Sequence, residues 1–176
     1  DADLASARHF PAINWLDSYS LYQDTVEDWF NENISEEWSE LRAEAMRLLQ
    51  EESDLEEIVQ LVGMDALSVK ERLVLETTKS IREDFLHQNA YHDVDTYTSL
   101  EKQFYMLKAI LTFYREGLET LEDGVEFSKV QNLAIRQDIA RAKYVEEENI
   151  DEIKELVQKV KDELDELRSE RGVRSA

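Results

Sequence analysis

The stretch SLEKQFYMLKAILTFYREGLETLEDG, residues 99–124, indicates the fold class of this chain more clearly than any other. Ser99 is a typical helix N-cap, and Gly124 is the residue type that most often follows a helix C-terminus. Between them apolar side chains recur at steps of three and four residues, which places them on one face of a long helix. They are Phe104, Leu107, Ile110, Leu111, Tyr114 and Leu118.

Helix starts of the same kind precede this stretch. They are Ser35, which two glutamates follow, and two capping boxes, Ser53 with Glu56 and Ser68 with Glu71. The first of these capping boxes predicts a separate short helix that runs to Val62 and is stopped by Gly63.

The N-terminal segment is less regular. Residues 1–12 look irregular up to Pro11, and a helix is predicted over residues 13–31. Its apolar and aromatic positions are Ile13, Leu16, Tyr19, Tyr22, Val26, Trp29 and Phe30. Residues 8–22 are unusually apolar and have no evident packing partner, so any part left open would favour self-association.

Beyond the central stretches, residues 88–98 lose the helical period and predict a loop. From residue 126 the helical pattern continues nearly to the end of the chain. Its last part is a heptad seam of about two and a half heptads, made of Ile150, Ile153, Val157, Val160, Leu164 and Leu167. Such a seam either closes the core of the bundle or lies along a helix of a partner.

The composition favours an all-α fold. The chain has 176 residues, 42% of them hydrophobic, which is enough for one domain with a core of ordinary size. It has only four glycines and one proline, whereas sheets and hairpins need such turn residues often. With no clear strand pattern, the sequence predicts a helical bundle of about six helices.

The charge limits the classes of partner. The net charge is −21, and so acidic a surface repels the phosphates of nucleic acid. No apolar run approaches the ~18–20 residues that span a bilayer, which argues against membrane insertion. The absence of cysteine excludes a disulfide framework.

The sequence offers no self-contained active site. It has no glycine-rich phosphate loop and no His-Glu-x-x-His motif. Asp84 and His87 have the carboxylate-x-x-His spacing of a di-iron bundle, but such a site needs the motif twice. We therefore assign no catalytic and no metal-binding residue, and a helical enzyme or metalloprotein is the weakest interpretation.

Two long strings carry a resemblance to a known family. RHFPAINWL, residues 8–16, and REDFLHQNAYHDVDTY, residues 82–97, closely resemble the catalytic A subunit of archaeal A-type and vacuolar (V-type) rotary ATPases. The resemblance is strong over roughly residues 7–22 and 58–116, and the rest follows in order with weaker local identity.

This resemblance implies an organisation and a function. Residues 1–12 would be a linker from a nucleotide-binding domain that is absent here, and residues 13–176 a C-terminal helical bundle domain. The intact subunit would bind ATP or ADP with Mg, whereas no cofactor is expected in the isolated chain, which should be inactive. Its partners would be B subunits of a hexameric ring and the rotor stalk. The whole complex would be attached to the cytoplasmic side of a membrane and would transport protons or sodium ions across it.

The resemblance also implies a binding site. Phe10 and Tyr91 stand where the family has the aromatic walls of the adenine pocket, and Gln88 lies close enough in sequence to offer a polar contact. The alternative is that both aromatic residues only pack in the core or linker. The turn around Gly63 and Met64 would face the rotor, or would be a plain joint between helices.

An alternative function keeps the fold without the ATPase. The chain would then be a freestanding helical module for protein interaction, derived from this family.

Overall fold

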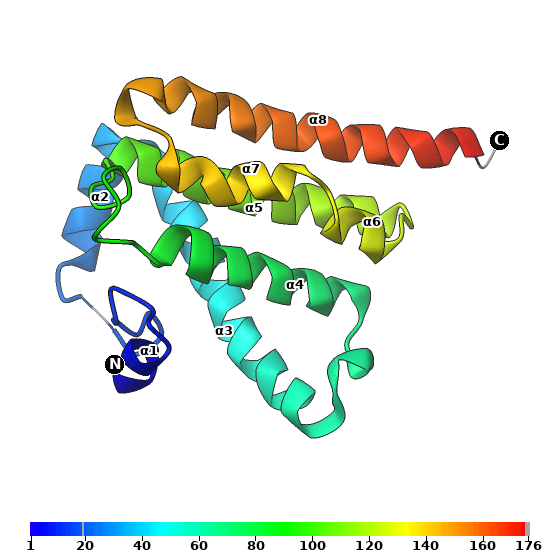
Figure 1. The fold of residues 1–176 in the computed structure, drawn as a ribbon, viewed down its shortest axis with the longest axis horizontal. Coiled ribbons are helices and arrows are strands. Elements are labelled where there is room, and N and C mark those ends of the chain that lie inside the picture. The colour runs from blue at the N-terminus through cyan, green and yellow to red at the C-terminus, as the bar shows by residue number, and fades with distance from the viewer. Residues whose placement is uncertain (19, 175–176) are drawn as a thin grey trace.

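The computed structural model describes residues 1–18 and 20–174, and every regular element in them is helical (Figure 1). Their eight α-helices are α1 (Ala2–Ser6), α2 (Gln23–Asn33), α3 (Trp38–Val62), α4 (Val69–Ser80), α5 (Leu100–Glu122), α6 (Phe127–Gln131), α7 (Ile135–Arg141) and α8 (Ile150–Arg174). Short 3-10 turns lie at Met64–Ala66, Ala142–Tyr144 and Glu147–Asn149, and a π-helical turn, Ile81–Leu86, extends α4.

The predicted all-α class is confirmed, and six of these α-helices have seven residues or more, in line with the expected number. Within the described part of the chain, no helix combines the length and the apolar character needed to cross a membrane.

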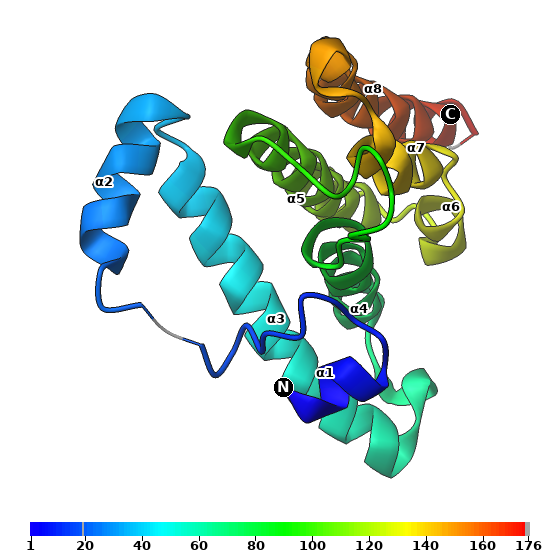
Figure 2. The same ribbon diagram turned by 60° about the vertical axis from the view of Figure 1, so that its left-hand side comes forward.

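The centre of the bundle is α5. Figure 2 shows α2 and α3 on one side of it and α6, α7 and α8 on the other. Thirteen of its 23 residues are buried, including Met106, Ala109 and Phe113 outside the predicted apolar face. A helix buried on more than one face is surrounded by neighbours, and α5 packs against α3, α4 and α8.

Close contact between α4 and α5 depends on Gly117. A Cβ atom at this position would lie 3.2 Å from Leu73 Cδ2, tighter than most side-chain contacts. The absent side chain therefore lets the two helices approach.

The heptad seam of α8 belongs to the core of the bundle. Ile153, Val157, Val160 and Leu164 are buried, and α8 makes its most extensive contacts with α5. Of the two interpretations of this seam, packing within the domain is the one confirmed.

The prediction of a helix boundary at Ser53 is wrong, because α3 runs without a break from Trp38 to Val62. Leu48 and Leu55 are both buried and keep one apolar face through this point. The capping signature therefore lies inside a continuous helix, because no glycine or proline interrupts the helix there. Gly63 does end α3, with a positive φ of 88°.

Two predictions for the N-terminal segment are also wrong. Residues 2–6 form the short helix α1, which the Asp1 carboxylate caps by accepting from the N–H groups of Asp3 and Leu4. Most of residues 13–22 are not helical, and α2 begins only at Gln23. Asn14 Oδ1 accepts from the backbone of Leu16, a bond that competes with helix formation. The predicted position Tyr19 and the chain end at 175–176 lie outside the described residues.

The helix signals around α4 and α5 are confirmed. Ser68 and Glu71 form the predicted capping box, and the Ser99 hydroxyl caps α5. The uninterrupted pattern predicted from residue 126 is wrong, because α6, α7 and two 3-10 turns divide this stretch before α8 begins.

Candidate functional site

The N-terminal segment lies against the turn that follows α4. The backbone N–H of Gln88 donates to the Phe10 carbonyl at 2.7 Å, and the N–H of Phe10 donates to His87 Nδ1 at 3.3 Å. His9 Nε2 lies 2.9 Å from the Arg82 carbonyl, so this nitrogen carries the proton. These contacts join segments more than 70 residues apart in sequence.

The apolar opening of the chain is only partly covered. Trp15 and Leu16 pack against the core, and the His9 and Trp15 rings lie 5.5 Å apart. Leu21 and Tyr22, in contrast, are exposed. The partner of this segment within the described chain is therefore the end of α4 and the adjacent part of α3.

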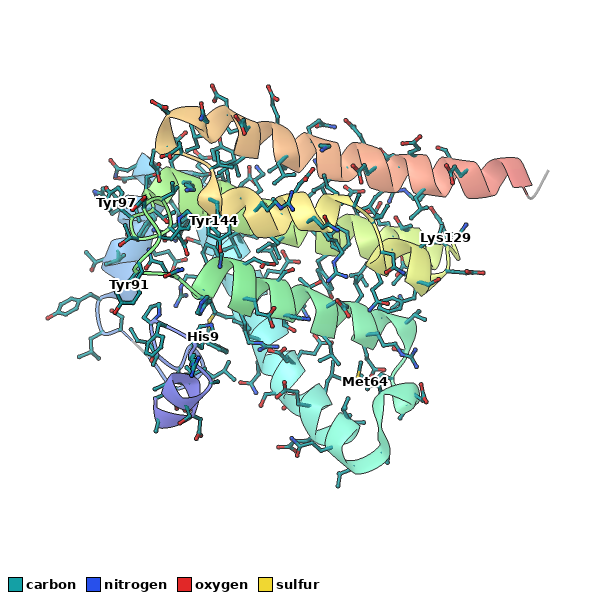
Figure 3. All side chains as sticks on the ribbon, in the orientation of Figure 1. His9, Met64, Tyr91, Tyr97, Lys129 and Tyr144 are labelled. Carbon is teal, nitrogen blue, oxygen red and sulfur yellow. The ribbon has the colours of Figure 1, made fainter. Side chains whose placement is uncertain are left out.

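The three predicted site residues lie in one region, and the structure brings two of them into direct contact. Phe10 and Gln88 share a backbone hydrogen bond, and the half-buried Gln88 lines a hollow of about 200 Å³ together with Pro11 and Asp95. Phe10 is 50% exposed and Tyr91 is 98% exposed. Tyr91 extends from the loop into solvent (Figure 3), so the two aromatic faces are open to a ligand or to another domain.

The loop that carries Tyr91 is held by its own side chains. The buried Asp95 carboxylate accepts from the N–H of Asn89 at 2.7 Å, and Asn89 Oδ1 accepts from the N–H of Tyr91 at 3.0 Å. His92 Nδ1 accepts from the N–H groups of Val94 and Asp95. Because each bond fixes the backbone locally, the loop presents Tyr91 from a defined turn.

The electrostatics of the site favour a neutral His87. Burial lowers its pKa, and the electrostatic interactions with Lys143 and His9 lower it further. The His9 and His87 rings lie 5.2 Å apart. A neutral imidazole can accept at Nδ1, and the N–H of Phe10 uses this acceptor.

Sequence reasoning missed two contributors to this region. His87 was considered only as a possible metal ligand with Asp84, and Lys143 was not considered although its side chain reaches the carbonyls of Glu83 and His87. No local signal identifies either role, because each partner lies more than 50 residues away in sequence. In the described residues, no group of three or more His, Cys, Asp or Glu side chains could hold a metal ion.

A second exposed surface lies at the tip between α3 and α4. Leu61, Val62 and Met64 are 83%, 65% and 47% exposed, and Gly63 between them has a positive φ. Figure 2 shows this tip extending away from α5 and α8. Adjacent apolar side chains at an exposed helix joint are typical of a contact with another protein.

Comparison with known proteins assigns this fold to a family. Residues 27–131 match the C-terminal domain of V and A type ATP synthase. The chain belongs to this family. The match covers α3, α4 and α5, and therefore both the exposed tip and the loop that carries Tyr91.

Curated relatives extend the similarity of this V and A type ATP synthase domain beyond the matched region. The chain is 62% identical over 161 residues to the V-type ATP synthase alpha chain of Thermoanaerobacter pseudethanolicus, covering 92% of this chain and 27% of that protein. It is 54% identical over 176 residues to the V-type ATP synthase alpha chain of Clostridium botulinum strain Okra, covering 100% of this chain and 30% of that protein. The chain thus spans less than a third of the length of these relatives, which come from bacteria.

Proposed function

We propose that this chain is the mechanical C-terminal part of a catalytic ATP synthase subunit. It would couple ATP synthesis or hydrolysis at the interfaces with B subunits to rotation of a central stalk, and so to transport of protons or sodium ions. The observation that carries this proposal is the 62% identity, over 92% of the chain, to a protein named V-type ATP synthase alpha chain.

The proposal divides the work between this chain and the rest of the subunit. ATP or ADP with Mg binds in the intact subunit, where groups outside this chain supply the chemistry at the phosphates. The 176-residue chain alone is expected to be inactive, because it has no phosphate-binding loop. The intact subunit belongs to the peripheral part of a membrane-attached complex, on the cytoplasmic side of the membrane.

The path of α4 supports mechanical coupling. This helix begins at Val69, directly after its N-cap Ser68 and next to the exposed tip, and continues through the π-helical turn to the loop that carries Tyr91. Its 12 residues span about 18 Å as a rigid rod. A displacement at the nucleotide end would therefore be carried to the tip, where Leu61, Val62 and Met64 would contact the rotor.

Within this function, Phe10 and Tyr91 are the proposed walls of the adenine pocket, with Gln88 as a polar contact. A base stacked between two aromatic rings buries apolar surface, and this stacking depends little on which base is bound. The exposure of both rings and the hydrogen bond between Phe10 and Gln88 support this role.

The first test is the mass of the native protein, detected in its source cells with an antibody against this chain, whose own mass is 20.7 kDa. A band several times heavier that purifies with a membrane-attached complex is the expected result. A native band near 20.7 kDa would replace the rotary function with the freestanding interaction module.

The second test concerns the aromatic pocket in the intact complex. Replacing Tyr91 by Ala is expected to raise KM for ATP by about tenfold, since one base–aromatic stack is removed. Tyr97→Ala is the matched control, because Tyr97 lies on the same loop and is 72% exposed. Equal effects of the two variants would contradict the adenine role of Tyr91.

A further inference from the structure

Two lysines are buried beside the loop that carries Tyr91. Lys102 in α5 is fully buried and Lys143 is 6% exposed, although lysine is almost never buried without partners. Lys143 Nζ donates to the carbonyls of Glu83 and His87, at 2.9 and 3.2 Å. These contacts join the 3-10 turn Ala142–Tyr144 to the C-terminal part of the π-helical turn and to the residue after it.

The two carbonyls lie at a helix end, where carbonyl groups lack partners within the helix. Lys143 satisfies both with one charged group, and such bonds are stronger than those between neutral groups. His87 directly precedes Gln88, so Lys143 fixes the direction in which the chain leaves the helix toward Tyr91.

Lys143 is itself held in place. Lys102 Nζ donates to the backbone carbonyls of Lys143 and Val145, at 3.0 and 2.6 Å. Lys102 thereby anchors the backbone on both sides of Tyr144 to the central helix α5. Burial lowers the pKa of Lys102. The acidic groups of Glu147, Asp95 and Glu146 act in the opposite direction and raise it.

Two further contacts connect the same segments. The rings of His92 and Tyr144 lie 4.5 Å apart, and Glu147 Oε1 accepts from the N–H of Ser99 at 3.0 Å. Figure 3 places Tyr144 at the same end of the bundle as Tyr91 and Tyr97. Residues 142–147 therefore contact the chain directly before the loop, in its middle and directly after it.

We propose that Lys143 is a positioning residue that fixes the loop of residues 88–98 to the segment preceding α8. The loop and the start of α8 then move as one unit. The consequence for ATP binding rests on the proposed function, because only there does the loop contact adenine.

The test is hydrogen–deuterium exchange of the assembled complex, read in peptides that cover residues 87–98. Lys143→Met keeps the length of the side chain and removes its charge and donors. Exchange in the loop is expected to rise about tenfold, while exchange in α5 stays unchanged. Lys129→Met is the matched control, because Lys129 is exposed at the opposite end of the bundle (Figure 3) and should leave the loop unaffected.

Lys143→Arg retains a cation that donates hydrogen bonds and is expected to keep exchange near that of the native protein. Should Lys143→Met not give a folded complex, Lys143→Gln takes its place, with an intermediate rate expected. Exchange in the loop that is unchanged in a folded Lys143→Met or Lys143→Gln complex would overturn the proposal.

Steady-state kinetics separate this inference from the proposed function. Faster exchange with a raised KM for ATP and unchanged kcat supports both. Faster exchange with unchanged KM supports the positioning role and contradicts the adenine contact. Unchanged exchange overturns the inference whatever the value of KM.

Discussion

At the residue scale, Glu52 joins α3 to the end of α4. Glu52 is 5% exposed, and its carboxylate accepts from the Thr78 hydroxyl at 2.8 Å and from Arg82 Nη2 at 2.9 Å. Replacing Glu52 by Ala leaves the half-buried guanidinium without its partner. We expect the free energy of unfolding, measured with urea, to fall by about 2 kcal/mol.

The neighbouring Glu51 provides the control for that experiment. It pairs with Arg47 one helical turn away at 2.9 Å, and the side chains of Arg47 and Glu51 are 55% and 38% exposed. Exposed pairs of this kind contribute less than about 0.5 kcal/mol. A loss in Glu51→Ala as large as in Glu52→Ala would show that burial of the Glu52 pair is not the cause.

His87 gives the domain a pH dependence at the same scale. Its pKa in the folded state is lowered from 6.5, first by burial and then by Lys143 and His9, so the folded state binds fewer protons than the unfolded state. This contribution is complete above the unfolded value and is lost as the pH falls through it toward the folded value. We expect thermal stability to fall below about pH 6.5 through this group.

The variant His87→Asn isolates this contribution, because an amide oxygen can still accept from the N–H of Phe10 and does not titrate. The stability of His87→Asn relative to the native chain should rise as the pH is lowered from about 7 to about 5. A difference that stays constant over this range would exclude His87 as the titrating group.

At the element scale, α8 is fixed by its apolar seam. Leu164 is fully buried and Leu167 is half-buried against the core. The double variant Leu164→Ala and Leu167→Ala should lower the free energy of unfolding by about 3–5 kcal/mol, mostly through the cavity at Leu164. Differential scanning calorimetry of the isolated chain measures this loss.

Leu61→Ala is the control for the α8 variant. Leu61 is 83% exposed at the tip between α3 and α4, so its truncation should change stability by less than about 0.5 kcal/mol. If the α8 variant were as stable as the control, the seam would serve a partner rather than the core.

At the scale of the whole molecule, the net charge of −21 acts against the compact state through self-repulsion. Sodium chloride screens this repulsion, so the urea midpoint should rise between about 0.01 and 0.5 M salt. Exposed ion pairs weaken over the same range, but each contributes little. A midpoint that falls with salt would show that the ion pairs outweigh the repulsion.

Features that depend on neighbours along the chain could be predicted from the sequence. The capping box at Ser68, the cap at Ser99 and the end of α3 at Gly63 all follow from local hydrogen bonding and backbone geometry. The heptad period likewise predicted which face of α8 is apolar, and resemblance to a family placed Phe10 and Tyr91 among the candidate residues.

Features that join distant segments depend on how the helices pack. The helix α3 continues through Ser53 because its apolar face is buried on both sides of this residue. The segment before α2 packs against the end of α4 and does not form the helix that its apolar spacing predicts. Lys102 and Lys143 reverse the usual preference of lysine for solvent, because each finds backbone carbonyls about 40 to 60 residues away. A local sequence pattern cannot predict such pairs, because the two partners meet only after the helices have packed.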